Sequence, residues 1–479
     1  MSAGTPDTVV EPADAAGERY SPLARPVVTG LGVVAPNGVG VEEHWAATLR
    51  GDLAITPITR FDVSGYAARL AGQVPDFDPN DYLDNRFIVQ TDRWTWFGMA
   101  ASKLAFADAG YDPATRDAYD TSVIFGAGSG GNDFGQKELS RLHTRGRTAV
   151  SVYQSIAWFY AATTGQTSIR HGLKGPSGVV VTDAAGGLDS LAQARRTIRR
   201  GTPSVLAGAA ESGLTPYALT CHLSSGRVST GADPRAAYKP FDVNANGYLP
   251  GEGGATLLVE HPAAAAERGA PKVYGEIAGY AATHDAHHHS QPAPGPTWLV
   301  AAMRRALADA AVEPGDVDVV FADGAGSPDL DALEAAALRE VFGANAVPVT
   351  APQGFVGRLC AGGSALTVAT ALLALRDGVL PAVGNLDEPD PAHGLDLVRE
   401  PRPCPARVAM VVARGFGGFN SVLVLRRGAR PARRGPARPR RRARPGDGHP
   451  PPRRRRRRGG RAGRARRDRP GGLGPRRLP

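Results

Sequence analysis

The stretch VVVTDAAGGLDSLAQARRTIRRG, residues 179–201, has the pattern of a buried strand, a tight turn and a helix. Its helical part carries apolar residues on one face, is basic in its last turn and ends at Gly201, as helix ends commonly do. A strand, a sharp turn and a helix in this order form the mount of a catalytic nucleophile. The residues at the turn are Asp183, Ala184 and Ala185, so the mount is present without a cysteine or serine on it.

The chain contains a faint internal repeat around this stretch. LAFADAGYDP (104–113) precedes the strand-like TSVIFGAGSGG (121–131), and RALADAAVEP (305–314) precedes DVDVVFADGAGS (316–327). The segment 183–201 is matched by LCAGGSALTVATALLALRDG (359–378), which also places AGG at the head of a helix. Two pairs in the same order predict a duplicated α/β fold with buried sheets.

Charge divides the 479-residue chain into an acidic body and a basic tail. The net charge is +10, but residues 426–479 hold 23 Arg and 2 Asp, so this tail carries +21 and the body −11. The tail has too few apolar residues to build a core. Three interpretations are open: a nucleic-acid-binding arm, an exposed tail with no task, and a GC-rich gene read out of frame, of which we favour the last.

Several classes of protein are excluded or disfavoured by composition. No apolar run has the length of a membrane span, and the polar first residues resemble neither a secretory signal nor a transit peptide. We therefore expect a cytoplasmic protein with a disordered N-terminal arm over residues 1–25. The three cysteines, Cys221, Cys360 and Cys404, make neither a disulfide framework nor a spaced metal motif.

Four further motifs give the chain a family resemblance. They are VVTGLGVVAPNGVG (27–40), KPFDVNANGYLPGEGGATLLVE (239–260), VPVTAPQGFVGRLCAGG (347–363) and GFGGFNSVLVL (415–425). Together with the strand, turn and helix of residues 179–201, called the elbow, they resemble the β-ketoacyl synthase family of the thiolase fold. The resemblance runs in order over residues 26–425. The resemblance implies an N-terminal half over 26–260, a C-terminal half over 261–425 and a five-layer αβαβα arrangement, with residues 426–479 as a disordered tail.

Within that family the chain is most similar to chain-length factors, the β subunits of type II aromatic polyketide synthases. The segment that carries this similarity is AWFYAATTGQTSIRHGLKGPSGVVV (157–181). The resemblance implies a heterodimer with a catalytic ketosynthase, paired along SGVVV (177–181). It also implies work on chains carried by an acyl carrier protein, with no cofactor. A membrane partner is not expected, and nucleic acid is an unlikely one.

The positions that would carry condensation are all altered. An active ketosynthase needs an elbow cysteine activated by the helix N-terminus, and two histidines that stabilise the developing enolate. By motif alignment, Ala184 stands at the cysteine position, Asp323 and Arg358 at the two histidine positions, and Gln353 at a supporting lysine. A methyl group cannot attack a thioester, and an anion at position 323 would oppose enolate charge. We therefore expect a subunit that does not condense.

The elbow also departs from the pattern of chain-length factors themselves. These proteins often carry glutamine at the elbow, a residue linked in that family to decarboxylative priming. Since this chain has Ala184, that role is not carried over, and Asp183, its neighbour, is the alternative residue that could act there.

A pocket for the growing chain is implied by the resemblance. The segment GGNDFGQKELSRLH (130–143) would line it at the interface with the ketosynthase, with Asn132, Phe134, Gly135 and Leu139 as the lining residues. Because Gly135 has no side chain and Leu139 is smaller than an aromatic ring, we expect a deep pocket and a long product. Ordinary packing is the alternative interpretation of these residues. Phe416 matches the gating phenylalanine of ketosynthases and, without an elbow thiol, is expected to serve packing.

An active acyltransferase with another nucleophile is the competing hypothesis. Ser190 and Cys360 both lie in or near elbow-type helices, although Ser190 is more than one turn into its helix.

Three motifs imitate other sites. DVNANGYLPGEG (242–253) imitates a calcium loop, HDAHHH (284–289) imitates a metal site, and GAGSGGNDFG (126–135) imitates a phosphate loop. Each lacks a required element of its motif, so no metal or phosphate site is expected.

Overall fold

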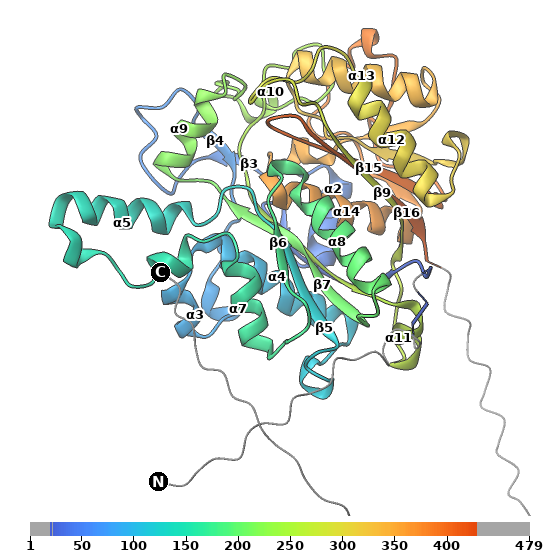
Figure 1. Cartoon of the computed structure of the whole chain (residues 1–479). Coiled ribbons are helices and arrows are strands. Elements are labelled where there is room, and N and C mark those ends of the chain that lie inside the picture. Colours follow the sequence, from blue (N-terminus) through green and yellow to red (C-terminus); the bar gives the residue numbers. More distant parts are fainter. Residues whose placement is uncertain (1–19, 22, 429–479) are drawn as a thin grey trace, which may run out of the picture. The chain divides into compact units, whose positions relative to one another are not determined.

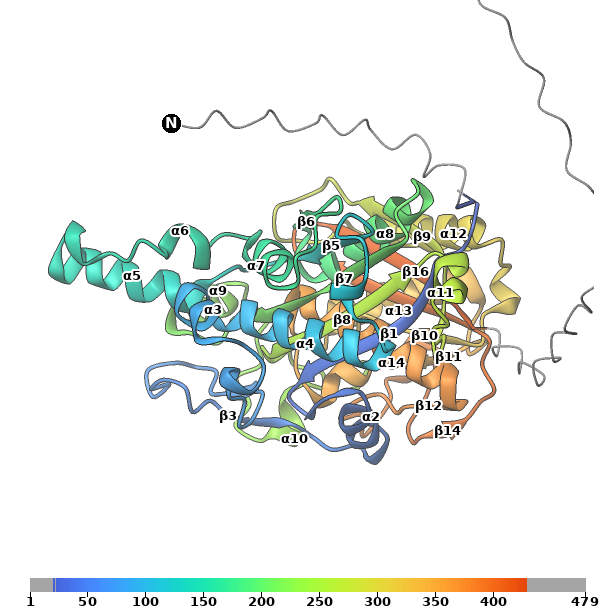
Figure 2. The same cartoon turned by 90° about the horizontal axis from the view of Figure 1, so that it is seen from below.

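The computed structural model describes residues 20, 21 and 23–428 (Figures 1 and 2). The N-terminal half contributes six strands to the main sheet: five lie in the spatial order β6-β5-β7-β8-β1, and the short β2 pairs with β1. Strands β6, β5 and β7 run parallel, whereas β8 is antiparallel to both β7 and β1. These strands are β1 (Val27–Ala35), β5 (Thr121–Gly126), β6 (Gly178–Val180), β7 (Ser204–Ser212) and β8 (Glu252–Glu260).

The C-terminal half repeats this arrangement. Its strands lie in the order β11-β10-β15-β16-β9, with β13 (Asp396–Leu397) beyond β11, and their directions match those of the first half strand for strand. The two halves form one continuous sheet because β1 pairs with β9. The predicted duplication is therefore confirmed. The strands are β9 (Gly275–His284), β10 (Val319–Phe321), β11 (Pro348–Thr350), β15 (Val408–Gly415) and β16 (Phe419–Arg427).

Helices form three layers around these strands. Helices α8 and α14 pack against each other and against strands of both halves, so they form the central layer. On the outer faces, α4 covers β1, β7 and β8, and α12 with α13 covers the other half (Figures 1 and 2). The expected thiolase-like αβαβα order is confirmed. The helices are α4 (Arg93–Ala109), α8 (Gly186–Arg199), α12 (Thr297–Ala310), α13 (Pro328–Phe342) and α14 (Cys360–Asp377).

Shorter elements decorate the layers, and α5 projects away from them with the segment that follows it (Figure 1). The strands are β2 (Gly38–Val39), β3 (Ile55–Pro57), β4 (Leu70–Gly72), β12 (Val379–Leu380) and β14 (Arg402–Pro403). The helices are α2 (Val41–Arg50), α3 (Asn85–Gln90), α5 (Asn132–Arg145), α6 (Gln154–Ala157), α7 (Ala162–His171), α9 (Pro216–Ser224), α10 (Pro234–Ala237) and α11 (Pro262–Glu267).

Both ends of the folded body extend beyond the expected boundaries. Tyr20, assigned to the arm, is buried with its ring against His261, and the Arg25 guanidinium donates to the carbonyl of Ala310. At the other end, Arg426 and Arg427 belong to β16 rather than to the tail. The rest of the arm and the basic tail from residue 429 lie outside the described residues. Among the described helices, none is long and apolar enough to cross a membrane.

Candidate functional site

The elbow forms as the sequence predicts, where β6 passes through a short turn, Asp183–Ala185, into α8. Asp183 has a left-handed backbone (φ 50°), which is rare for a residue other than glycine and gives the turn its sharpness. Packing requires the second glycine after the turn, Gly187, because a Cβ there would lie 2.5 Å from the backbone nitrogen of Ala365 in α14. Helices α8 and α14 therefore meet closely at their N-terminal ends.

Ala184 points into a small inner pocket between the two elbow-type helices. Its side chain is 6% exposed, whereas Ala185 is fully buried in the central core. The other positions assigned from the sequence, Asp323, Gln353 and Arg358, line the same pocket, together with Cys360, Ser364 and Thr367. Residues that are up to 183 positions apart in the chain, Ala184 and Thr367, thus line one pocket.

Asp323 and Arg358 form an ion pair in this pocket. Arg358 Nη2 lies 3.0 Å from Asp323 Oδ1 and 2.9 Å from Oδ2, and both side chains are largely buried. Burial alone would lower the pKa of Arg358, but the Asp323 carboxylate raises it above its ordinary value. The charge that Asp323 would bring against an enolate is therefore neutralised, because the two altered histidine positions pair with each other.

Gln353 fixes the loop that carries Asp323. Its side-chain amide donates to the carbonyl of Ala322 at 2.7 Å and to that of Asp323. Gln353 Oε1 is buried and has no hydrogen-bond partner among the described residues. A lysine at this position would bring a positive charge to the pocket, whereas the amide of Gln353 supports only backbone geometry.

The structure does not favour either alternative nucleophile. Burial, with the carboxylates of Asp183 and Glu211 nearby, raises the pKa of the Cys360 thiol well above its ordinary value, so the reactive thiolate is suppressed. Ser190 is fully buried inside α8, and its hydroxyl donates to the carbonyl of Gly187. Neither side chain has a base that would activate it within hydrogen-bond distance among the described residues.

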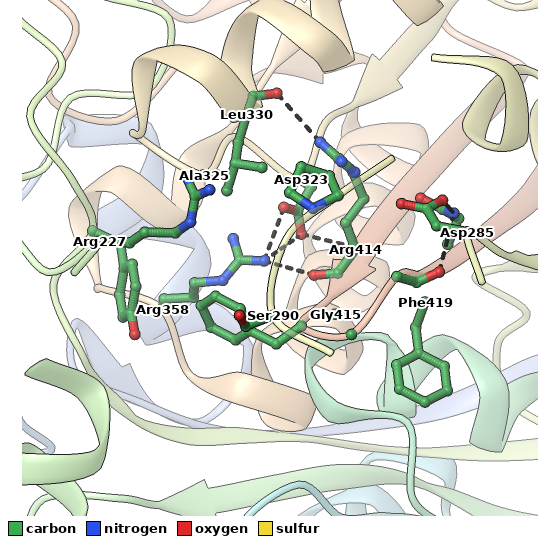
Figure 3. A pocket seen from close by; sticks show the side chains of 16 residues that line it. Arg227, Asp285, Ser290, Asp323, Ala325, Leu330, Arg358, Arg414, Gly415 and Phe419 are labelled. Carbon is green, nitrogen blue, oxygen red and sulfur yellow. Dashed lines mark hydrogen bonds and ion pairs between the residues drawn. The ribbon is translucent and has the colours of Figure 1, made fainter. Parts of the chain in front are cut away.

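A second pocket, named the outer pocket, shares the ion pair with the first, and Figure 3 shows the side chains that line it. Asp323 and Arg358 line both pockets, and the turn between β15 and β16, residues 415–419, forms much of the outer wall. Phe416 lies in this turn with its ring 6.2 Å from that of Tyr248, and its backbone amide donates to Asp183 Oδ2 at 2.7 Å. These contacts support the packing role expected for Phe416.

Glu211, at the end of β7, was not anticipated from the sequence. Its carboxylate accepts hydrogen bonds from the backbone amides of Gly128 and Ser129 and from the Ser129 hydroxyl. The glycine-rich loop therefore directs its amide groups at a carboxylate of the protein. A charged residue at the end of the otherwise small and apolar strand AGAAES was the available signal.

The buried position of Glu211 predicts a pH effect on stability. Burial raises the pKa of this carboxyl from 4.5 to about 7 despite its hydrogen bonds. The folded protein therefore holds a proton that the unfolded chain releases above about pH 4.5, so stability falls as pH rises from there to about 7. We expect Glu211→Gln to remove a slope of about 1.4 kcal/mol per pH unit in this window, measured by urea unfolding.

The exposed carboxyl of Glu340 provides the control for this experiment. Its side chain is about half exposed, so Glu340→Gln should leave the slope of stability against pH unchanged. Parallel profiles for the native chain and Glu211→Gln would contradict the assignment.

The residues expected to line the chain pocket lie on the first three turns of α5. Asn132, Phe134 and Gly135 precede Leu139, whose side chain is 55% exposed. Gly135 is closely covered, because a Cβ built there would lie 3.0 Å from Cδ1 of Trp158. Its part in lining a deep chamber stays a prediction. The indole of Trp158 thus covers this glycine, a contact between α5 and the end of α6 that sequence spacing does not indicate.

The acidic residues of the calcium-like motif, residues 242–253, are engaged within the protein. Asp242 accepts from the backbone amides of Asp387 and Glu388, while Glu252 is paired with Arg60 and Arg93. Within the described residues, no group of three or more His, Cys, Asp or Glu side chains has an arrangement that could hold a metal ion.

Comparison with known proteins places this geometry in a family. Residues 24–265 match the β-ketoacyl synthase N-terminal domain and residues 274–387 the C-terminal domain. The chain is 53% identical to the tetracenomycin polyketide synthase ketoacyl synthase beta subunit of Streptomyces glaucescens, over 84% of this chain and 98% of that protein. It is 50% identical, with the same coverage, to the actinorhodin polyketide putative beta-ketoacyl synthase 2 of Streptomyces coelicolor.

Solved structures agree with these relatives. The ishigamide ketosynthase/chain length factor matches with a TM-score of 0.80 at 27% identity, covering 85% of this chain and 100% of that one. AntDE:AntF, a type II acyl carrier protein in complex with its ketosynthase, matches with a TM-score of 0.77 at 26% identity and the same coverage. The chain therefore belongs to the β-ketoacyl synthase family, within its ketosynthase beta subunits, the chain-length factors.

Proposed function

We propose that this chain is the non-condensing subunit of a type II polyketide synthase, which pairs with a catalytic ketosynthase and forms part of the chamber that limits chain length. The observation that carries the proposal is the inner pocket, where a methyl group faces a neutralised ion pair on an otherwise intact elbow. Such a pocket lacks the nucleophile that acyl transfer requires, and the Nη2 group of Arg358 is already engaged by Asp323.

The surface around the elbow supports pairing with another subunit. Strand β6 ends the main sheet at one edge, and Val181, directly after it, is 46% exposed. Large exposed apolar side chains gather on the neighbouring elements α5 to α7 and α9: Leu139, Trp158, Phe159, Ile169 and Tyr217. Exposed apolar patches mark interaction sites, and obligate pairs bury about 2,000 Å² or more. This surface is suited to a permanent partner.

A charge placed at the end of β6 should weaken the heterodimer. We expect Val181→Lys to raise the dissociation constant at least tenfold, because a lysine amine buried in an apolar interface loses its hydration without gaining a partner. The measurement is affinity chromatography of the tagged ketosynthase followed by analytical ultracentrifugation. Val243→Lys, at an equally exposed valine in the loop before β8, is the matched control. Equal affinity in both variants would contradict the use of this edge.

The whole proposal is tested by reconstitution. The chain, a candidate ketosynthase and a malonyl-loaded acyl carrier protein should together yield a polyketide of defined length, and omission of this chain should abolish that product. A ketosynthase that makes the same product with or without it would overturn the proposal.

A further inference from the structure

The inner and outer pockets share a wall, and that wall is the Asp323–Arg358 ion pair. The inner pocket holds Ala184, Gln353 and Cys360, while the outer pocket lies under the turn between β15 and β16 (Figure 3). Only the two charged side chains line both. Any passage between the two pockets therefore runs past this pair.

The ion pair also holds the start of the turn. Arg358 Nη2 donates to the carbonyl of Arg414 at 2.7 Å, and the backbone amide of Arg414 donates to Asp323 Oδ1 at 3.0 Å. Both backbone groups of one residue are thus bound by the two partners of the pair. Arg414 is itself buried, and its guanidinium donates to the carbonyl of Leu330 (Figure 3).

Two residues further on, the turn is held from the opposite direction. The Phe416 amide donates to the carboxylate of Asp183, which stands on the elbow itself. Gly415, between the two anchored residues, has no room for a side chain, since a Cβ there would lie 2.9 Å from the carbonyl oxygen of Thr182. Residues 414–416 are therefore attached to the loop after β10, to the head of α14 and to the elbow.

We propose that the Asp323–Arg358 pair is a latch, which holds the turn 414–419 against the elbow and closes the inner pocket to a thioester-bearing arm arriving through the outer pocket. A pair of partly buried, mutually neutralised charges suits this role, because separating them would leave both charges uncompensated. The elbow of this subunit would then be held closed by the latch as well as lacking a nucleophile.

The latch is tested by hydrogen exchange and thiol accessibility rather than by activity. In the full chain, Asp323→Asn keeps the shape of the side chain and removes the charge, and the double variant Asp323→Ala with Arg358→Ala removes the latch. We expect amide exchange at Phe416 to accelerate at least tenfold in the double variant and less in Asp323→Asn. Exchange of the Phe416 amide is informative because Asp183, which accepts the hydrogen bond of that amide, is not substituted in either variant.

Alkylation by iodoacetamide gives the second readout. Cys360 should react at least tenfold faster in the double variant, while exposed Cys221 reacts equally in all proteins and serves as the internal reference. The double variant of the exposed pair Arg304–Glu340, each to alanine, is the matched control. Unchanged exchange at Phe416 and unchanged Cys360 alkylation in a folded Asp323→Asn or double variant would overturn the latch.

The experiment is run on the chain alone and on its heterodimer with the ketosynthase, whose formation rests on the proposed function. If the heterodimer does not form, the proposed function fails, while the measurements on the chain alone still decide the latch.

Discussion

Purified without a partner, the chain should form no carbon–carbon bonds from malonyl-loaded acyl carrier protein. The methyl group of Ala184 cannot accept an acyl chain, and the two positions that would hold histidines carry an aspartate and an arginine paired with each other. Loss of a nucleophile together with its partners typically costs a factor of about 10⁶ in turnover. The measurement is mass spectrometry of the carrier protein after incubation, with the reconstituted heterodimer as the positive control.

The same experiment distinguishes the competing acyltransferase hypothesis. If the chain alone does condense malonyl units, and Ser190→Ala or Cys360→Ala abolishes the reaction, that hypothesis is correct. We expect neither variant to change the activity of the heterodimer by more than about twofold, because Ser190 is bonded within its own helix and the Cys360 thiol is held in its neutral form.

The elbow and the duplicated topology were predictable from the sequence because both depend on local patterns. An apolar run, a turn and an amphipathic helix follow one another within residues 179–201, and the two halves repeat that order. The four altered positions could be assigned by motif alone. Their convergence on one pocket depends on how β10, β11 and the head of α14 meet, which spacing along the chain does not specify.

Sequence reasoning failed where a contact joins distant segments. The sequence marks the carboxylate at position 323 as an anion, but nothing local indicates its pairing with Arg358, 35 positions away. The missing side chain of Gly135 suggests space for a chain, although Trp158 covers that glycine. In both cases the effect of the residue depends on a partner that only the tertiary fold brings near. Arg358 neutralises the charge of Asp323, and the ring of Trp158 covers Gly135.

The length of the polyketide should depend on Leu139 more cleanly than on Gly135. A phenylalanine at position 135 would meet Trp158, so it would overpack the α5–α6 contact at a cost of about 1–3 kcal/mol and shift the indole. Any change in product from that variant would mix chamber volume with altered structure. Leu139 is 55% exposed in the chain, so a larger ring there extends outward without displacing a neighbour.

In the reconstituted synthase, Leu139→Phe should shorten the product by at least one two-carbon unit, while Leu139→Ala should leave it unchanged or lengthen it. The reason is steric: a growing chain cannot occupy volume that a close-packed side chain already fills. Ser140→Phe is the matched control, because residue 140 is exposed on the same helix but is turned about 100° from residue 139. Mass spectrometry gives the carbon count, and co-purification shows that each variant still pairs.

Two outcomes would show that residues 132–139 do not line the end of the chamber. One is an intact pair in which Leu139→Phe leaves the carbon count unchanged, and the other is a Ser140→Phe variant that shortens the product equally. Chain length would then be set elsewhere on the apolar surface beside β6, where Phe159 and Tyr217 are the next exposed side chains to substitute.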